Sequence, residues 1–242
     1  MFNKTKLTSN IASAALLLGA GLAAPIMAHA DEDEIIVRGQ YLYSDQVNAL
    51  KSPTPILDVP QSLSIITADQ IAKQGFESVG DIINYVPGVT NSQGEGHRDA
   101  VVFRGVRSTA DFFLDGVRDD VQYYRGLYNV EQLEVLRGAN ALLFGRGGTG
   151  GLVNRVTKKG QIGEQFIGYK GYIDTFGAFG AELDANYTVT DNAAFRLNGM
   201  YESLNNHRDF YEGDRFAINP TARFELSPSS ICLLYTSDAA DD

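Results

Sequence analysis

Apolar and polar residues alternate with a period of two through the last third of this chain. The alternation runs over Gln165–Asp174, Ala178–Val189, Ala193–Leu204 and Asp214–Leu226. In the second run, every other residue from Phe179 onward is apolar or small, and the residues between them are polar or glycine. This period predicts β-strands that have one apolar and one polar face.

The lengths of these strands and of their connections favour a transmembrane β-barrel. The four runs are 10 to 13 residues long, the connection at 190–192 is short, and the connection at 205–213 is long and charged. Long strands with short turns at one end and long loops at the other are typical of outer-membrane barrels. A soluble, half-buried sheet is the alternative, but it does not explain the repeated Phe and Tyr. The residues expected to face lipid are Phe179, Leu183, Tyr187, Phe195, Leu197, Tyr201, Phe216, Ile218 and Phe224.

Residues 61–160 have the mixed pattern of a compact α+β domain. Leu63, Ile65 and Thr67 alternate as a short strand, and Thr67 can cap a helix that runs to Gln74 and stops at Gly75. Ser78 opens a second helix, predicted at Val79–Tyr85. The remaining predicted elements are strands at Val101–Arg104, Phe112–Leu114, Glu134–Arg137 and Gly151–Thr157, a tight turn at Asp115-Gly116, and a helical turn at Val130–Leu133.

The first 60 residues read as a targeting segment followed by a flexible lead. Lys4 and Lys6 precede the apolar run Ile11–Leu22, and a small-x-small cleavage site ends at Ala30. This pattern predicts a signal peptide over residues 1–30. A membrane anchor is the alternative, but the run is short for a spanning helix. Residues 31–60 are polar, except for a β-prone island at Glu34–Val37 that is either a partner-binding segment or an ordinary edge strand.

Net charge limits the class of partner, and the position of the single cysteine bears on which residues belong to the predicted fold. The 242-residue chain has a net charge of −10, which argues against nucleic acid as a partner. The single cysteine, Cys232, lies in Ile231–Asp242, where the alternating pattern breaks. This tail resembles translated sequencing-adapter read-through, so we expect residues 231–242 to be non-native and exclude them from the predicted fold.

The sequence contains no convincing catalytic or metal-binding set. His97 and His207 are isolated, and no Ser/His or Cys/His pair has a supporting context. Gly145–Gly150 matches G-x-G-x-x-G, but the following residues continue as a strand rather than the helix that a dinucleotide site requires. We therefore expect no enzyme activity, no catalytic residue, no metal and no cofactor.

Arginine and aromatic residues gather in the middle of the α+β domain. In a chain of net negative charge, such a cluster suggests an anionic or aromatic ligand. Internal ion pairing with the nearby aspartates is an equally weighted alternative for any one of them. The candidate ligand-binding residues are Arg104, Arg107, Arg118, Tyr123, Tyr124 and Arg125.

Five motifs, in order, resemble the TonB-dependent siderophore receptors. Val59–Thr67 looks like the opening strand of their plug domain, Phe103-Arg104-Gly105 like its arginine-glycine signature, and Phe113–Val117 like its aspartate-glycine turn. Val130–Ala139 is similar to the segment that ends in arginine-glycine-proline in most relatives, with Ala139 in place of the proline. Leu143–Asn154 resembles the closing glycine-rich hairpin.

This resemblance implies a plug domain (61–160) inside a 22-stranded antiparallel barrel, of which 165–226 supplies the first four strands. It implies that Glu34, Ile35, Ile36 and Val37 form the TonB box, which can add as a strand to periplasmic TonB. The implied function is import of a ferric siderophore, the cargo, across the outer membrane. Receptors for cobalamin, haem or oligosaccharide are the rivals, and a passive porin is a weaker one because it needs no plug.

Four strands leave an open edge that a bilayer does not accept. On this resemblance we therefore expect the chain to be the N-terminal part of a longer receptor, without a separate signalling domain before the plug.

Overall fold

The computed structural model describes residues 5–6, 46–47, 54–55, 62–92, 98–108, 111–119, 121–138, 150–207, 212–227 and 229–235. These residues belong to one compact unit, formed by Met1–Leu7 and Tyr43–Asp242. The predicted TonB box at Glu34–Val37 and most of the predicted signal peptide lie outside the described residues, as do residues 139–149 of the glycine-rich segment.

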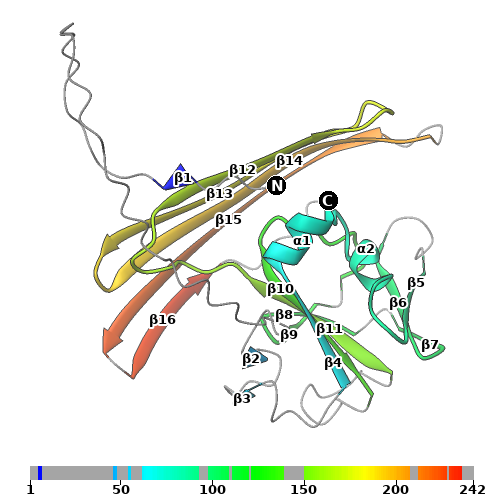
Figure 1. Ribbon diagram of the computed structural model, residues 1–242, viewed down its shortest axis with the longest axis horizontal. Helices are drawn as coiled ribbons and strands as arrows, with labels where there is room; N and C mark the ends of the chain where they lie inside the picture. Colours follow the sequence, from blue (N-terminus) through cyan, green and yellow to red (C-terminus); the bar gives the residue numbers. More distant parts are fainter. Residues whose placement is uncertain are drawn as a thin grey trace, which may run out of the picture. The chain divides into compact units, whose positions relative to one another are not determined.

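The α+β part is built on a five-stranded sheet, the core sheet, with strand order β4-β10-β11-β8-β9. Its strands are β4 (Ser62–Thr67), β10 (Val130–Arg137), β11 (Gly151–Thr157), β8 (Phe112–Leu114) and β9 (Val117–Arg118). β10 pairs antiparallel with both neighbours, whereas β11 and β8 run parallel (Figure 1). The sheet therefore joins segments that lie far apart in the sequence.

Two short helices follow the first strand, and side chains cap both as the sequence predicts. In α1 (Ala68–Gln74), Thr67 and Gln70 form a capping box, and Gly75 ends the helix with a φ of 68°. In α2 (Val79–Ile83), Ser78 and Asp81 form the same arrangement. α2 ends two residues before the predicted Tyr85.

The predicted helical turn at Val130–Leu133 is wrong, because these residues begin strand β10. Leu133, Val135 and Leu136 are fully buried, and β10 lies between β4 and β11. Both faces of β10 are covered, and its buried residues include the polar Gln132 and Glu134, so the strand lacks the period-two signal that identifies a half-buried strand.

A small three-stranded sheet, β5-β6-β7, completes the α+β part. It consists of β5 (Val89–Ser92), β6 (Ala100–Phe103) and β7 (Val106–Ser108), of which only β6 was predicted. The hydrophobic core joins both helices to both sheets; its bulky members include Phe76, Ile82, Ile83, Phe103, Phe112, Leu133 and Val153. A separate two-stranded pair is formed by β2 (Gln46–Val47) and β3 (Thr54–Pro55).

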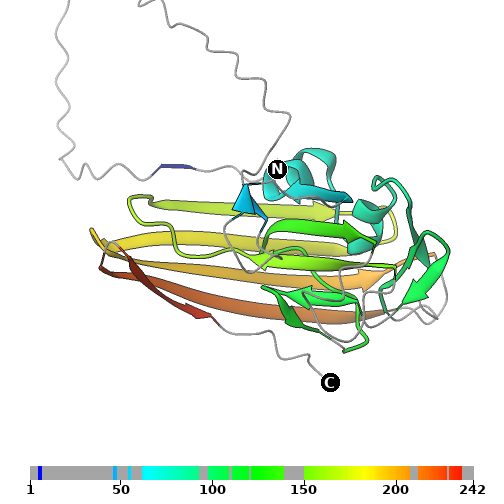
Figure 2. The same cartoon turned by 90° about the horizontal axis from the view of Figure 1, so that it is seen from below.

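The second large element is a six-stranded sheet, the long sheet, with order β1-β12-β13-β14-β15-β16. Its central strands are β12 (Phe166–Ile173), β13 (Phe179–Thr190), β14 (Ala193–Asn205) and β15 (Glu212–Ser227). They form an antiparallel meander of long, adjacent strands (Figure 2). The turn between β13 and β14 is short and the connection from β14 to β15 is long, as predicted.

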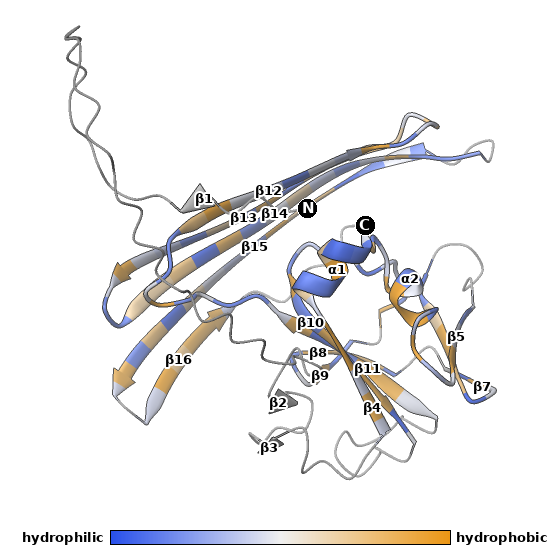
Figure 3. Ribbon diagram, in the orientation of Figure 1, coloured by the Kyte–Doolittle hydropathy of each residue, from blue (hydrophilic) through white to orange (hydrophobic). Residues whose placement is uncertain are grey.

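The polarity of the long sheet is the reverse of that of a soluble protein. Its outward face exposes Phe179, Leu183, Tyr187, Phe195, Leu197, Tyr201, Phe216 and Ile218. Its other face buries the polar residues Asp184, Asn186, Arg196, Asn198, Asn219 and Thr221. Figure 3 shows the resulting hydrophilic and hydrophobic bands along the strands. Phe224, the ninth residue of the predicted set, is half-buried and packs edge-on against Phe195 of the outward face, so the register is the predicted one.

Short strands flank this meander on either side. β1 (Thr5–Lys6), which falls inside the predicted signal peptide, pairs with β12. β16 (Ser230–Tyr235) pairs with β15, so the sheet continues into the tail that the sequence pattern excludes from the fold. Unlike its neighbours, β16 exposes residues of both faces. The non-native origin of residues 231–242 stays a prediction.

Within the described part of the chain, neither helix is long and apolar enough to cross a membrane.

Candidate functional site

Two of the sequence motifs are tight turns of the same kind. Arg104 and Gly105 connect the paired residues Phe103 and Val106, and both turn residues have positive φ, 48° and 89°. Asp115 and Gly116 likewise have φ of 48° and 78°. Positive φ at both central positions defines the type I′ turn, which matches the twist of a two-strand hairpin. The glycine in each motif is required by this geometry.

The candidate ligand-binding residues are divided by the fold between the surface and the interior. Arg104 and Arg107 are exposed on the β6–β7 hairpin, and Tyr124 is 37% exposed. Arg118 in β9 is half-buried. Arg125 is only 2% exposed, and Tyr123 beside it is half-buried. The six residues therefore do not form one surface.

Arg125 is held in an internal network of charges. Its Nε donates to Asp119 Oδ2 at 2.9 Å, and its Nη2 donates to the carbonyl oxygen of Val121 at 2.7 Å. The guanidinium lies 3.8 Å from the centre of the Phe112 ring, and its Nη1 is 3.7 Å from Asp99 Oδ2. Stacking and ion pairing together satisfy this cation inside the domain.

Arg155 extends the same network. Its Nη2 donates to Asp119 Oδ2 and to the Tyr123 hydroxyl oxygen, each at 2.8 Å. Burial raises the pKa of Tyr123, and burial also raises the pKa of Asp99 in spite of the backbone hydrogen bond and the charge of Arg125. Arg125 is thus placed as the ion-pairing interpretation expects, and the Tyr123 hydroxyl oxygen accepts a hydrogen bond from Arg155 beside it.

The Asp115 turn is tied to the end of β11. Asp115 Oδ2 accepts from the Thr157 hydroxyl at 2.6 Å, and Oδ1 accepts from Lys159 Nζ at 2.8 Å. The Gly116 N–H donates to Asn154 Oδ1 at 2.9 Å. These contacts give the carboxylate a structural position rather than an open one.

Arg137, which the sequence interpretation did not single out, lies close to Arg104. It donates to the hydroxyls of Ser62 and Ser64 at 2.9 and 3.0 Å and to the carbonyl oxygen of Pro87 at 3.1 Å. Burial and the like charge of Arg104 lower the pKa of Arg137. The sequence feature that could have identified Arg137 is its position in the Val130–Ala139 motif. The two guanidinium groups form a local cationic spot.

A second set of charges connects the α+β part to the long sheet. Arg196 in β14 makes a bidentate pair with Asp184 in β13, with both distances 2.8 Å. Lys158 Nζ lies 3.1 Å from Asp184 Oδ2, and Arg196 Nη1 lies 3.2 Å from Glu131 Oε2. Arg196, Asp184 and Lys158 are each at most 5% exposed. Burial lowers the pKa of Lys158.

Backbone packing at this junction is equally close. Arg196 Nη1 donates to the carbonyl oxygen of Lys159 at 3.2 Å. A Cβ on Gly160 would lie 2.7 Å from the carbonyl oxygen of Ala194, so only glycine fits there without movement. Sequence periodicity placed Asp184 and Arg196 on the polar face but could not show which residues of the α+β part they meet.

Known proteins share both parts of this architecture. Residues 55–152 match the family model of the TonB-dependent receptor plug domain. Over 208 residues, 82% of this chain and 28% of the relative, the sequence is 32% identical to the probable TonB-dependent receptor BfrD of Bordetella pertussis. It is 28% identical over 218 residues to the catecholate siderophore receptor Fiu of Escherichia coli K12, covering 86% of this chain and 28% of Fiu.

Solved structures agree. The open form of the ferric-catecholate import receptor Fiu from E. coli K12 superposes with a TM-score of 0.71 and 27% identity, over 79% of this chain and 28% of that one. The siderophore receptor PiuA of Acinetobacter baumannii gives 0.70 and 28%, over 80% and 28%. The chain spans about 28% of the length of these relatives. With its α+β plug and its outward-apolar barrel strands, the chain belongs to the family of TonB-dependent receptors of the outer membrane.

Proposed function

We propose that this chain contributes the plug and part of the barrel wall of a receptor that binds a ferric siderophore and imports it across the outer membrane. The observation that carries the proposal is the reversed polarity of the long sheet. Its polar face meets the plug through Lys158, Asp184 and Arg196, while its aromatic face is left to lipid. A wall of this kind, filled by a plug, suits gated transport. Relatives named as siderophore receptors support the ligand class.

The ligand class is tested by growth on defined iron sources. We expect a strain lacking the receptor to lose growth on a purified ferric siderophore and to regain it when the gene is restored. Relatives named for catecholates and for ferrioxamine B match this chain with similar identity, 28% and 31%. The panel of chelators should therefore include both. Rescue by cobalamin, haem or an oligosaccharide alone would instead support a rival receptor.

We also propose that transport is energised by TonB through Glu34–Val37, residues outside those the structure describes. Strand addition uses backbone N–H groups, so replacing Ile36 with proline removes one donor. We expect the Ile36→Pro variant to bind ferric siderophore normally and to lose uptake. An Ile36→Val variant, which keeps the N–H group, is the control. Unimpaired uptake by Ile36→Pro would remove the assignment.

A passive porin is the alternative from another functional class. In planar bilayers, a plugged receptor should show little steady conductance, whereas a porin conducts without any energy source.

Export follows from the predicted signal peptide, and the mature protein should begin at Asp31. We propose no bound cofactor, since the ferric siderophore is cargo.

Among the candidate ligand residues, the exposed arginines are the stronger ones. Arg104 and Arg107 lie on the surface, whereas Arg125 directs its donors into the plug. Charge-assisted hydrogen bonds to an anionic siderophore are roughly twice as strong as neutral ones. We expect alanine at Arg104 or Arg107 to weaken siderophore binding several-fold without unfolding the plug. If binding is unchanged in both variants and in Arg118→Ala and Tyr124→Ala, the site lies on other parts of the receptor.

A further inference from the structure

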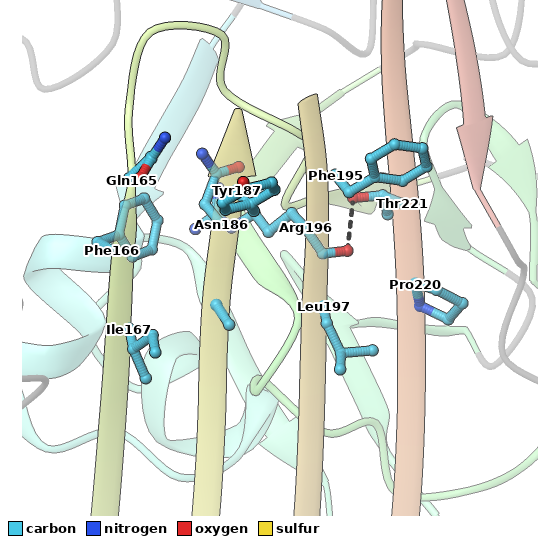
Figure 4. Close-up of a pocket in the computed structure, with 11 residues that line it drawn as sticks. Gln165, Phe166, Ile167, Asn186, Tyr187, Phe195, Arg196, Leu197, Pro220 and Thr221 are labelled. Atoms are coloured by element: carbon cyan, nitrogen blue, oxygen red, sulfur yellow. Dashed lines mark hydrogen bonds between the residues drawn. The ribbon is translucent and has the colours of Figure 1, made fainter. Parts of the chain in front are cut away.

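The outward face of the long sheet contains a hollow of about 310 Å³ over strands β12 to β15. Figure 4 shows Tyr187 and Phe195 at one level of the sheet, and Ile167, Leu197 and Pro220 at the next. Ala185 lies among them, in the same cross-strand row as Ile167 and Leu197. The hollow exists because the alanine is short and its neighbours on either side are long.

Every outward-facing side chain that lines the hollow is apolar except at one end. Ile167, Leu197 and Pro220 contribute only hydrocarbon, and Tyr187 adds an aromatic ring that is 61% exposed. The amide of Gln165 and the Tyr187 hydroxyl provide polar groups on the side of the short turns. The hollow thus has an apolar body and a polar end, which is the polarity of an amphiphile.

The level of the hollow in the membrane follows from the connections. The β13–β14 connection is two residues long, at 191–192, and the β14–β15 connection covers residues 206–211. In bacterial barrels the short turns are periplasmic, and aromatic girdles mark both interfaces. Phe195 is two residues from the start of β14, so the hollow lies in the periplasmic half of the wall. That half is bordered by the inner leaflet.

We propose that this hollow is a binding site for one acyl chain of an inner-leaflet phospholipid. The chain lies over Ala185 between Ile167 and Leu197, and the head group lies toward Gln165 and the short turns. An acyl chain in the bilayer is already surrounded by hydrocarbon, so its gain in the hollow comes from van der Waals contacts rather than from removal of apolar surface from water. A chain that fills the hollow makes more such contacts than a lipid on the flat parts of the wall and is therefore retained in preference to it. This site is separate from siderophore binding and goes beyond the proposed import function.

Photo-crosslinking in a membrane tests the proposal. The receptor is reconstituted in vesicles of phosphatidylethanolamine and phosphatidylglycerol that contain a trace of phosphatidylethanolamine with a diazirine in one acyl chain. After irradiation, labelled peptides are quantified by mass spectrometry. Fragmentation of the labelled peptides locates the label to single residues. We expect Tyr187 and Leu197 to be labelled several-fold more than Phe216, an outward residue outside the hollow that is 66% exposed.

Two variants and one control make the result specific. Ala185→Phe fills the hollow and Tyr187→Ala removes its rim, so each should abolish the excess labelling. Ala181→Phe adds the same ring to the same strand and face but outside the hollow, and should leave the labelling unchanged. Heat-modifiability on gels confirms that each variant is folded. Equal labelling of all outward peptides, or excess labelling only from a diazirine-bearing lipid A probe, would overturn the proposal.

Discussion

At the scale of single residues, the plug depends on charges that are paired in its interior. Arg125 and Arg155 share Asp119, and Arg125 also faces Asp99. Such groups contribute little when the pair is complete, because desolvation offsets the attraction. Removal of one partner is costly, because the other charge stays buried without compensation.

We therefore expect Arg125→Ala to lower the stability of the plug by roughly 3–5 kcal/mol. Calorimetric unfolding of the receptor measures this loss. Arg107→Ala removes an exposed arginine of the same domain and is the matched control, with an expected change within about 0.5 kcal/mol. A plug that tolerates Arg125→Ala but no longer binds siderophore would instead return this residue to the ligand site.

Asp99 gives a prediction for pH dependence. Burial raises the pKa of its carboxyl in the folded protein above the ordinary value, about 3.9 in the unfolded chain. Between these two values the folded state holds a proton that the unfolded state has lost. The contribution of Asp99 to stability therefore falls as the pH rises through this window and is constant above it. The difference in the free energy of unfolding between the wild type and Asp99→Asn should decrease as the pH rises through this window. An increase of this difference with pH would contradict the assignment.

The sequence predicted local contacts between residues better than distant ones. The caps at Thr67 and Ser78 follow from residues three positions apart, and both were found. For Arg125, the partner Asp119 is six residues away and Asp99 is 26 residues away, and the linear pattern could not show whether the arginine faces either of them or a ligand. Arg137 and Arg104, which are 33 positions apart in the chain, could not be paired at all from a linear pattern.

At the scale of elements, exposure decided what could be predicted. The strands of the long sheet have one face in each environment, so their period of two is plain and their predicted ends differ from the observed ends by two residues at most. β10 is buried on both faces and was misread at Val130–Leu133. The short strands β5, β7 and β9 have two to four residues, too few to show any period.

The register of the long sheet predicts a strong effect of charge on its outward face. Ile218 is 66% exposed there, and the register pairs it with Gly199. We expect Ile218→Arg to cost roughly 2–4 kcal/mol if it lies near the bilayer midplane. Urea titration of folding into lipid vesicles measures the cost, with Ile218→Leu as the control. A negligible cost would mean that this face does not meet hydrocarbon.

At the scale of the whole molecule, the plug and the wall have separate sources of stability. The hydrophobic core cluster, from Ile71 to Val153, lies entirely within the plug. The plug meets the long sheet through buried charges that include Lys158, Asp184 and Arg196, none of which belongs to this cluster. The plug therefore does not need the wall to bury its apolar side chains.

We accordingly expect residues 61–160 to fold when expressed alone, since a domain of about 100 residues can bury a sufficient core. Nuclear magnetic resonance should give well-dispersed amide signals, with protection from exchange greatest in β10 and β11. The variant Leu133→Ala, which opens a cavity in this core, serves as the unfolding reference. Collapsed signals from the unmodified fragment would show that the wall is required.

The one-residue alternation of the long sheet also limits how such a wall can change in length during evolution. Insertion of a single residue within β14 would turn every later side chain of that strand to the other face, bringing Arg196 or Asn198 to lipid according to the site of insertion. Insertion of two residues preserves the faces and only lengthens the strand. Gene variants that persist should therefore gain or lose residues in pairs within strands. In the 206–211 connection, where no alternation has to be kept, any number can be added.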